Sequence, residues 1–225
     1  MAFAGFDSVA YPGDDVMAWL KANTNLSFAG YYLQSMVEDK AYNWPGRRAT
    51  LVAQGWGLAP IFIPVHNPGF LTPSQAQMQG GQDGTVARDL MSAEGFPQKA
   101  VAYLSLEPIL EQDAALSPSW SNYVATWFEV VGLSNFHTPG ILCQPLAAAS
   151  LLAFRPSSLV WCSKFQGAAP GPGYPPNLPA NDPSGCGLAT ATLWQWAQQA
   201  ILSGTPVGDI EVNLNCASVA DPSVP

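Results

Sequence analysis

The sequence predicts an α/β fold in which eight strands close into a (β/α)8, TIM-type barrel. Eight short apolar runs rich in aromatic and β-branched residues recur along the chain, and helical patterns separate the earlier ones. Repeated strand–helix–strand units imply parallel strands joined by right-handed crossovers. Eight such strands within 225 residues favour a closed barrel over an open sheet.

The expected strands are runs of four to eight residues that end near Gly, Pro, Asn or Ser. They cover residues 3–8, 28–33, 58–65, 99–106, 140–144, 158–163, 192–197 and 210–215.

Helices are expected over residues 13–23, 44–55, 82–95, 117–132 and 145–154. The clearest signals flank residues 117–132, where Ser117 suits the N-cap, Pro118 the first helical position and Gly132 the stop. Asp residues in the first turn and apolar residues at helical spacing support residues 13–23.

The C-terminal third departs from this pattern, so we expect a degenerate helical layer there. Residues 164–189 are rich in Pro and Gly, which excludes a helix and predicts a long loop. Such a loop could be an interdomain linker or an active-site loop that replaces a barrel helix. The residues after it are too few to bury a core of their own, which favours one domain over residues 1–225.

Charge and hydropathy exclude several classes of partner. The net charge is −8 and only 11% of residues are charged, so the basic surface that nucleic acids or anionic membranes require is missing. The first residues, MAFAGFDSVAYPGDD, contain neither a basic segment nor a long apolar one. We therefore expect no nucleic acid partner, no membrane insertion and no classical signal peptide; export, if it occurs, uses another route, and the localisation stays open.

The cysteines and histidines give no support for a cofactor. The four cysteines never form a C-x-x-C pair and the two histidines are isolated, so a zinc site is not expected. Cys143 and Cys162 are typical core residues. A disulfide between Cys186 and Cys216 is left open, and the redox compartment with it. No dinucleotide or P-loop motif is present, so no cofactor is expected.

Strand alternation predicts polar side chains on the inner face of the barrel, near the C-terminal strand ends where barrel enzymes bind substrate. In AYLSLE, Ser105 and Glu107 share one face and Leu104 and Leu106 the other. The candidate substrate-binding residues are Tyr32, Gln34, His66, Ser105, Gln144, Gln195 and Asn213.

Two acids, Asp7 and Glu107, end otherwise apolar strands and are the candidate catalytic residues. A structural role is open for each: Asp7 could hold backbone N–H groups in an Asx-turn, and Glu107 could begin a helix. As a pair they fit glycoside hydrolysis, in which one carboxyl group protonates the leaving oxygen and another stabilises or captures the oxocarbenium-like carbon.

Several motifs resemble a known family. GFDSVAYPG, FAGYYL, GLAPIFIPV and GGQDGTVARDLMSAEGFPQKAVAYLSLE, within residues 3–110, resemble the glycoside-hydrolase-like domain DUF1906. LWQWA followed by IEVNLN is similar to the ending of the related family 25 lysozymes. The resemblance implies a glycoside-hydrolase-like barrel whose first-strand and fourth-strand acids are Asp7 and Glu107.

The family 25 pattern is incomplete here, because Ser105 and Asn213 replace two of its usual carboxylates. The resemblance implies hydrolysis of a β-linked glycan such as the peptidoglycan of bacterial cell walls. The alternative is a catalytically inactive glycan-binding or structural module of the same fold.

Overall fold

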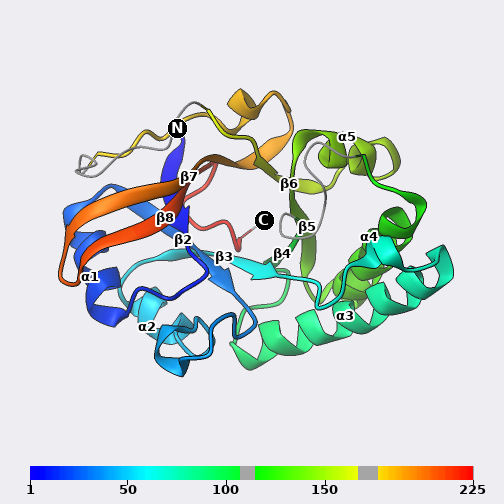
Figure 1. Ribbon diagram of the computed structural model, residues 1–225, viewed down its shortest axis with the longest axis horizontal. Coiled ribbons are helices and arrows are strands. Elements are labelled where there is room, and N and C mark those ends of the chain that lie inside the picture. The colour runs from blue at the N-terminus through cyan, green and yellow to red at the C-terminus, as the bar shows by residue number, and fades with distance from the viewer. Residues whose placement is uncertain (107–114, 167–176, 225) are drawn as a thin grey trace.

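A computed structural model describes residues 1–106, 115–166 and 177–224, and its centre is a closed barrel of eight strands in sequence order (Figure 1). The closed α/β barrel expected from the sequence is therefore confirmed. The strands are β1 (Phe3–Asp7), β2 (Leu26–Tyr32), β3 (Gly57–Phe62), β4 (Val101–Ser105), β5 (Thr138–Cys143), β6 (Leu159–Ser163), β7 (Ala191–Thr205) and β8 (Gly208–Ala217).

The expectation that all eight strands run parallel is wrong for the last strand. Strands β1 to β7 pair in parallel, whereas β8 is antiparallel to both β7 and β1. Thr205 pairs with Gly208, so only a tight turn joins β7 to β8. A turn of this length makes a hairpin, because a parallel connection needs a crossover of a dozen residues or more. The barrel is mixed and departs from the (β/α)8 arrangement at this hairpin.

The α-helices lie between the first six strands, as expected, and cover the outside of the barrel (Figure 1). They are α1 (Asp14–Asn23), α2 (Arg48–Ala53), α3 (Pro73–Ala93), α4 (Pro118–Gly132) and α5 (Pro145–Phe154). Four 3-10 turns are described as well, η1 (Lys40–Tyr42), η2 (Pro68–Phe70), η3 (Leu133–Asn135) and η4 (Pro183–Cys186). After α5 the described residues contain no further α-helix, in agreement with the predicted degenerate layer.

Helix α3 begins nine residues before its predicted start at residue 82, because Thr72 and Gln75 form a capping box around Pro73. Its glycines let α4 approach closely. A Cβ atom on Gly80 would lie 2.3 Å from the Tyr123 carbonyl oxygen. At the same crossing the Tyr123 hydroxyl donates a 2.6 Å hydrogen bond to buried Asp83. Tight packing thus compensates for the low helix propensity of this Gly-rich segment.

The C-terminal segment closes the bottom of the barrel, and Figure 1 shows the last described part of the chain, in red, at the centre of the ring. Asp221 accepts a 3.0 Å hydrogen bond from the Leu58 N–H, and the Ser223 carbonyl accepts a 2.8 Å bond from the Val101 N–H. Leu58 and Val101 lie at the starts of β3 and β4. The segment therefore covers the N-terminal strand ends and leaves the opposite mouth to polar side chains.

All four cysteines are buried, as expected for Cys143 and Cys162, and none of them forms a disulfide, so Cys186 and Cys216 are not linked. Within the described ranges, no helix has the length and apolar character needed to cross a membrane.

Candidate active site

Asp7 is the last residue of β1, and its carboxylate lies inside the barrel at the C-terminal mouth. Its side chain is 1% exposed. The neighbouring strand makes room for it with Gly30, since a Cβ atom there would lie 2.5 Å from the Asp7 Cβ. The Gly-x-Asp pattern of β1 and the Gly of β2 thus place a carboxylate where bulky side chains would exclude it.

Four neutral side chains donate hydrogen bonds to this carboxylate. Oδ1 accepts from Asn215 Nδ2 at 2.7 Å and from Gln195 Nε2 at 3.0 Å. Oδ2 accepts from Asn213 Nδ2 at 2.9 Å and from the Tyr32 hydroxyl at 3.1 Å. Three of the four donors lie on the β7–β8 hairpin, so the antiparallel last strand is what surrounds Asp7 with amides.

Two further hydrogen bonds fix the orientation of these amides. The Trp161 indole N–H donates to Asn215 Oδ1 at 3.1 Å, and the Ser163 hydroxyl donates to Gln195 Oε1 at 3.0 Å. Because each amide oxygen already has a donor from β6, each NH2 group faces Asp7. Trp161 and Ser163 therefore position the donors without touching the carboxylate.

Burial raises the pKa of Asp7 above its ordinary value, and the four hydrogen bonds, that from Asn215 foremost, act in the opposite direction. All four partners are uncharged, so hydrogen bonds from neutral groups offset only part of the desolvation of the ionised carboxylate. The arrangement can hold a negative charge inside the mouth, where it would stabilise a developing positive charge on a bound molecule.

The structure brings Tyr32, Gln195 and Asn213 together around Asp7, as donors to its carboxylate. Gln34 instead joins two strand ends, since its Nε2 donates to the Ile63 carbonyl at 2.6 Å and its Oε1 accepts from the Ile63 N–H at 3.1 Å.

The remaining predicted residues are not among the described hydrogen-bond donors to Asp7. Ser105 is buried at the C-terminal end of β4, and Gln144 is the half-buried N-cap residue of α5. His66 is exposed and follows the end of β3. Glu107 lies outside the described residues, so its predicted role stays a prediction.

Asn215, Trp161 and Ser163 were not among the predicted site residues. For Asn215 the signal was available, because alternation in IEVNLN places it on the same face as Asn213. By the same rule Trp161 and Ser163 share a face of β6. Their link to the site depends on the register of β6 with β7, in which Trp161 lies opposite Leu193 and Ser163 opposite Gln195.

A pocket of about 230 Å³ lies at the rim of the same mouth, between the residues that follow β1 and the start of β8. It is lined by Ser8, Ala10, Tyr11, Pro12, Tyr42, Val207, Ile210 and Glu211.

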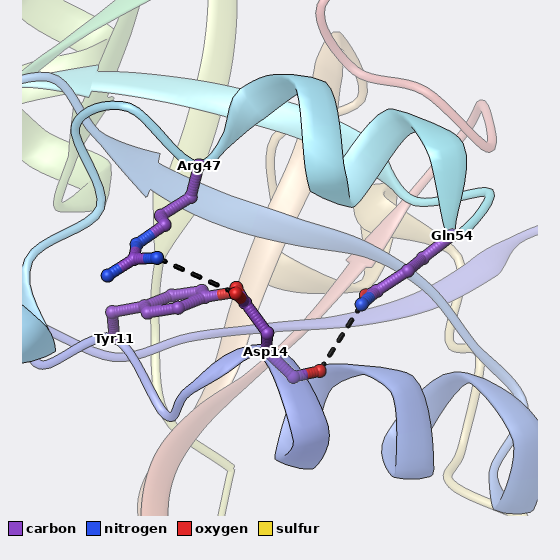
Figure 2. Close-up of polar contacts among 4 residues, drawn as sticks. All are labelled: Tyr11, Asp14, Arg47 and Gln54. Carbon is purple, nitrogen blue, oxygen red and sulfur yellow. Dashed lines mark hydrogen bonds and ion pairs between the residues drawn. The ribbon is translucent and has the colours of Figure 1, made fainter.

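Tyr11 lines this pocket. Figure 2 shows the polar contacts around Tyr11 and Asp14. The Tyr11 hydroxyl donates to the Asp14 carboxylate, which also lies 3.5 Å from the Arg47 guanidinium, and Gln54 Nε2 donates to the Asp14 carbonyl at 3.2 Å.

Across the described part of the chain, no group of three or more His, Cys, Asp or Glu side chains is arranged to hold a metal ion.

Comparison with solved structures reveals how this barrel is related to known proteins. An uncharacterized protein of B. stearothermophilus aligns with a TM-score of 0.63 at 18% identity, over 96% of each chain. The Tat-secreted protein Rv2525c of Mycobacterium tuberculosis aligns with a TM-score of 0.62 at 13% identity, over 99% of this chain and 97% of that one.

A third solved structure shows which known fold the barrel resembles. GHIP, a glycosyl hydrolase 25 of Streptococcus pneumoniae, aligns with a TM-score of 0.57 at 10% identity, over 96% of this chain and 87% of that one. The chain has a family 25 glycoside-hydrolase-like fold. No family model and no curated protein matches the sequence, and at these identities the structural similarity establishes the fold alone.

Proposed function

We propose that this protein binds a β-linked glycan, such as peptidoglycan, at the C-terminal mouth of its barrel and hydrolyses it. The observation that carries the proposal is the buried, inward-facing carboxylate of Asp7, held by four side-chain donors at the end of the barrel where barrel enzymes build active sites. The family 25 fold agrees with this chemistry.

In this proposal Glu107 is the proton donor. It follows β4 after Leu106, and the C-terminal end of β4 belongs to the same mouth as Asp7. Glycoside hydrolysis requires a carboxylic acid that protonates the leaving oxygen and a second carboxylate that stabilises or captures the oxocarbenium-like carbon. Asp7 fits the stabilising part, since both of its oxygens already accept hydrogen bonds.

The test is the release of reducing ends from purified peptidoglycan. The Glu107→Gln variant should lose a factor of about 10²–10⁴ in rate, because it removes the general acid. Asp15→Asn, which alters an exposed acid of α1, is the matched control and should keep full activity. Equal activity of the wild type and Glu107→Gln would exclude Glu107 as the proton donor.

The second candidate is a catalytically inactive module that binds glycan in the same mouth. Each oxygen of Asp7 already accepts two hydrogen bonds from the protein, and Asn213 offers an amide where family 25 lysozymes have an acid. This candidate predicts co-sedimentation with insoluble peptidoglycan and no reducing ends after long incubation. Any product that depends on Glu107 would refute it.

A further inference from the structure

The pocket at the rim of the barrel mouth lies where β1 and β8 separate. The two strands are paired in register as far as Asp7 and Asn213, where β1 ends. Residues 208–212 of β8 pair with β7 alone among the described strands. Ile210 and Glu211 both line the pocket although consecutive side chains of a strand point to opposite faces. The pocket therefore adjoins the edge of β8 that β1 leaves unpaired.

The walls of the pocket are mostly apolar and are held in place by contacts behind them. The Tyr11 N–H donates to the Tyr42 carbonyl at 2.9 Å, and the Tyr11 ring packs edge-on against Trp44 with ring centres 5.0 Å apart. Methylene groups of a ligand would thus be buried against a surface that already exists. The aliphatic part of the lining comes from Ala10, Pro12, Val207 and Ile210.

Glu211 is the charged side chain of the lining. It is exposed, and it forms no ion pair or hydrogen bond with a side chain in the described ranges. The Arg47 guanidinium lies 5.3 Å from the centre of the Tyr11 ring, but it is paired with Asp14 at 3.5 Å. The carboxylate of Glu211 is therefore free to pair with a cation, and the net charge of −8 also favours a cationic ligand.

The size and the polar content of the pocket indicate which ligand fits. Its volume of about 230 Å³ is smaller than the roughly 300–1,000 Å³ of pockets that enclose a drug-sized ligand, so it suits one side chain of a longer molecule. A sugar ring would leave several hydroxyl groups without partners against the apolar walls. A lysine side chain instead buries its methylene groups and places its ammonium group at the rim, beside Glu211.

We propose that this pocket binds a lysine side chain of an extended peptide, with the ammonium group paired with Glu211 and the peptide backbone along the unpaired edge of β8. Such an edge offers N–H and C=O groups to an added strand, and a pocket beside it supplies side-chain specificity. The inference goes beyond the proposed glycan hydrolysis and does not depend on it.

The test is a titration of the isotope-labelled full-length chain with acetyl-Ala-Lys-Ala-N-methylamide, followed by backbone NMR. We expect saturable shifts of the Ala10, Tyr11, Ile210 and Glu211 amides with a millimolar dissociation constant, since one side chain is buried. The same peptide with an acetylated lysine has no charge there and should bind about two- to fivefold more weakly, the range for an exposed ion pair. n-Pentylamine has the amine without the backbone and should also bind more weakly.

Matched variants distinguish the charge from the shape of the pocket. Glu211→Gln should weaken binding of the lysine peptide by the same factor of about two to five and leave binding of the acetylated peptide unchanged. Glu129→Gln alters an exposed acid of α4 and should bind both peptides as the wild type does. Ala10→Phe fills the pocket from an exposed position and should abolish the shifts at Ile210 and Glu211.

Three results would contradict the inference. Equal affinity of the wild type for the lysine peptide and its acetylated form, or shifts confined to residues outside the pocket, would overturn the proposal. Equal affinity for n-pentylamine and the lysine peptide would overturn the assignment of a peptide. None of these probes contains a sugar, so the result is separate from that of the peptidoglycan assay.

Discussion

The side-chain amide of Asn215 joins three strands at one point, since its Nδ2 donates to Asp7 at 2.7 Å and its Oδ1 accepts from Trp161 at 3.1 Å. Asn215 lies on β8, Asp7 on β1 and Trp161 on β6. The amide therefore holds the carboxylate and the far wall of the barrel in a fixed relation, and all three side chains are buried.

Replacing Asn215 by Ala should lower the free energy of unfolding by about 2–4 kcal/mol, because Asp7 loses its shortest donor and the Trp161 N–H loses its acceptor in a buried site. Urea unfolding followed by tryptophan fluorescence measures the change. Asn23→Ala is the control, since Asn23 makes an exposed hydrogen bond to the Trp19 carbonyl, and it should cost less than about 0.5 kcal/mol. Equal losses in the two variants would show that the buried amide has no special role.

The raised pKa of Asp7 predicts a pH dependence of stability. Between the unfolded pKa and the higher folded pKa, the unfolded chain ionises first, so stability that is complete at low pH is lost as the pH rises through this window. We expect the difference in unfolding free energy, wild type minus Asp7→Asn, to be largest near pH 3.5 and to shrink toward pH 7. A difference that grows with pH would mean that the four donors dominate over burial.

A second carboxylate beside Asp7 should amplify this effect. In Asn213→Asp, an acid replaces the amide whose Nδ2 lies 2.9 Å from Asp7 Oδ2. Two acids this close cannot both ionise without strong repulsion, so one pKa rises and the fold should lose about 1–3 kcal/mol between pH 4 and pH 7. Asn213→Ala, which removes the donor without adding charge, should show much less pH dependence. Parallel curves for the two variants would contradict the prediction.

Adjacent glycines of α3 should respond in opposite directions to Ala. At Gly80 the new methyl group would lie 2.3 Å from the Tyr123 carbonyl oxygen, whereas at Gly81 the nearest atom is 3.6 Å away. Gly80→Ala should destabilise by about 1–3 kcal/mol through overpacking, and Gly81→Ala should stabilise by about 0.5–1 kcal/mol through helix propensity. Thermal unfolding by circular dichroism measures both, and a stabilising Gly80→Ala would refute the close helix crossing.

Asp221 should be important for the stability of the C-terminal segment that covers the N-terminal strand ends. Its Oδ1 accepts from the Leu58 N–H and from the N–H and hydroxyl of Ser223. Asp221→Ala leaves these donors without their acceptor and should cost about 1–3 kcal/mol in urea unfolding, while Asp209→Ala at an exposed position should cost little. Hydrogen exchange at the Leu58 amide should also accelerate in Asp221→Ala, and unchanged exchange would contradict the bond.

Local signals predicted the helices well where residues typical of helix starts and ends were present. Ser117 and Pro118 begin α4 as predicted, and α5 has the expected bounds Pro145–Phe154. The start of α3 was missed although Thr72, Pro73 and Gln75 mark it locally, because the glycines that follow argue against a helix. Close packing against α4 explains Gly80. Such packing joins distant segments and cannot be deduced from propensity.

The direction of β8 was missed for a different reason. Strand β7 continues through residues 198–205, beyond the predicted end at residue 197, so the space assigned to a crossover is occupied by a hairpin. Gly204 and Gly208, both with positive φ, flank the turn and are its local signal.

Alternation identified Asp7, Tyr32, Gln195 and Asn213 because each lies well inside a strand or at its end. It does not apply to His66 and Gln34, because β3 ends at Phe62 and β2 ends at Tyr32, so both residues lie beyond their strands. Past a strand end the two-residue period no longer determines which way a side chain points.

The β7–β8 hairpin supplies most of the groups around Asp7 from one continuous segment. Gln195, Asn213 and Asn215 belong to one continuous β-ribbon, whereas the carboxylate they surround comes from the opposite end of the sequence. Exchange of this ribbon for one with other polar residues would change the charge and hydrogen bonding around Asp7 while the other six strands kept their sequence. For protein engineers, the β7–β8 hairpin is therefore a single segment through which the electrostatic potential at the barrel mouth can be altered.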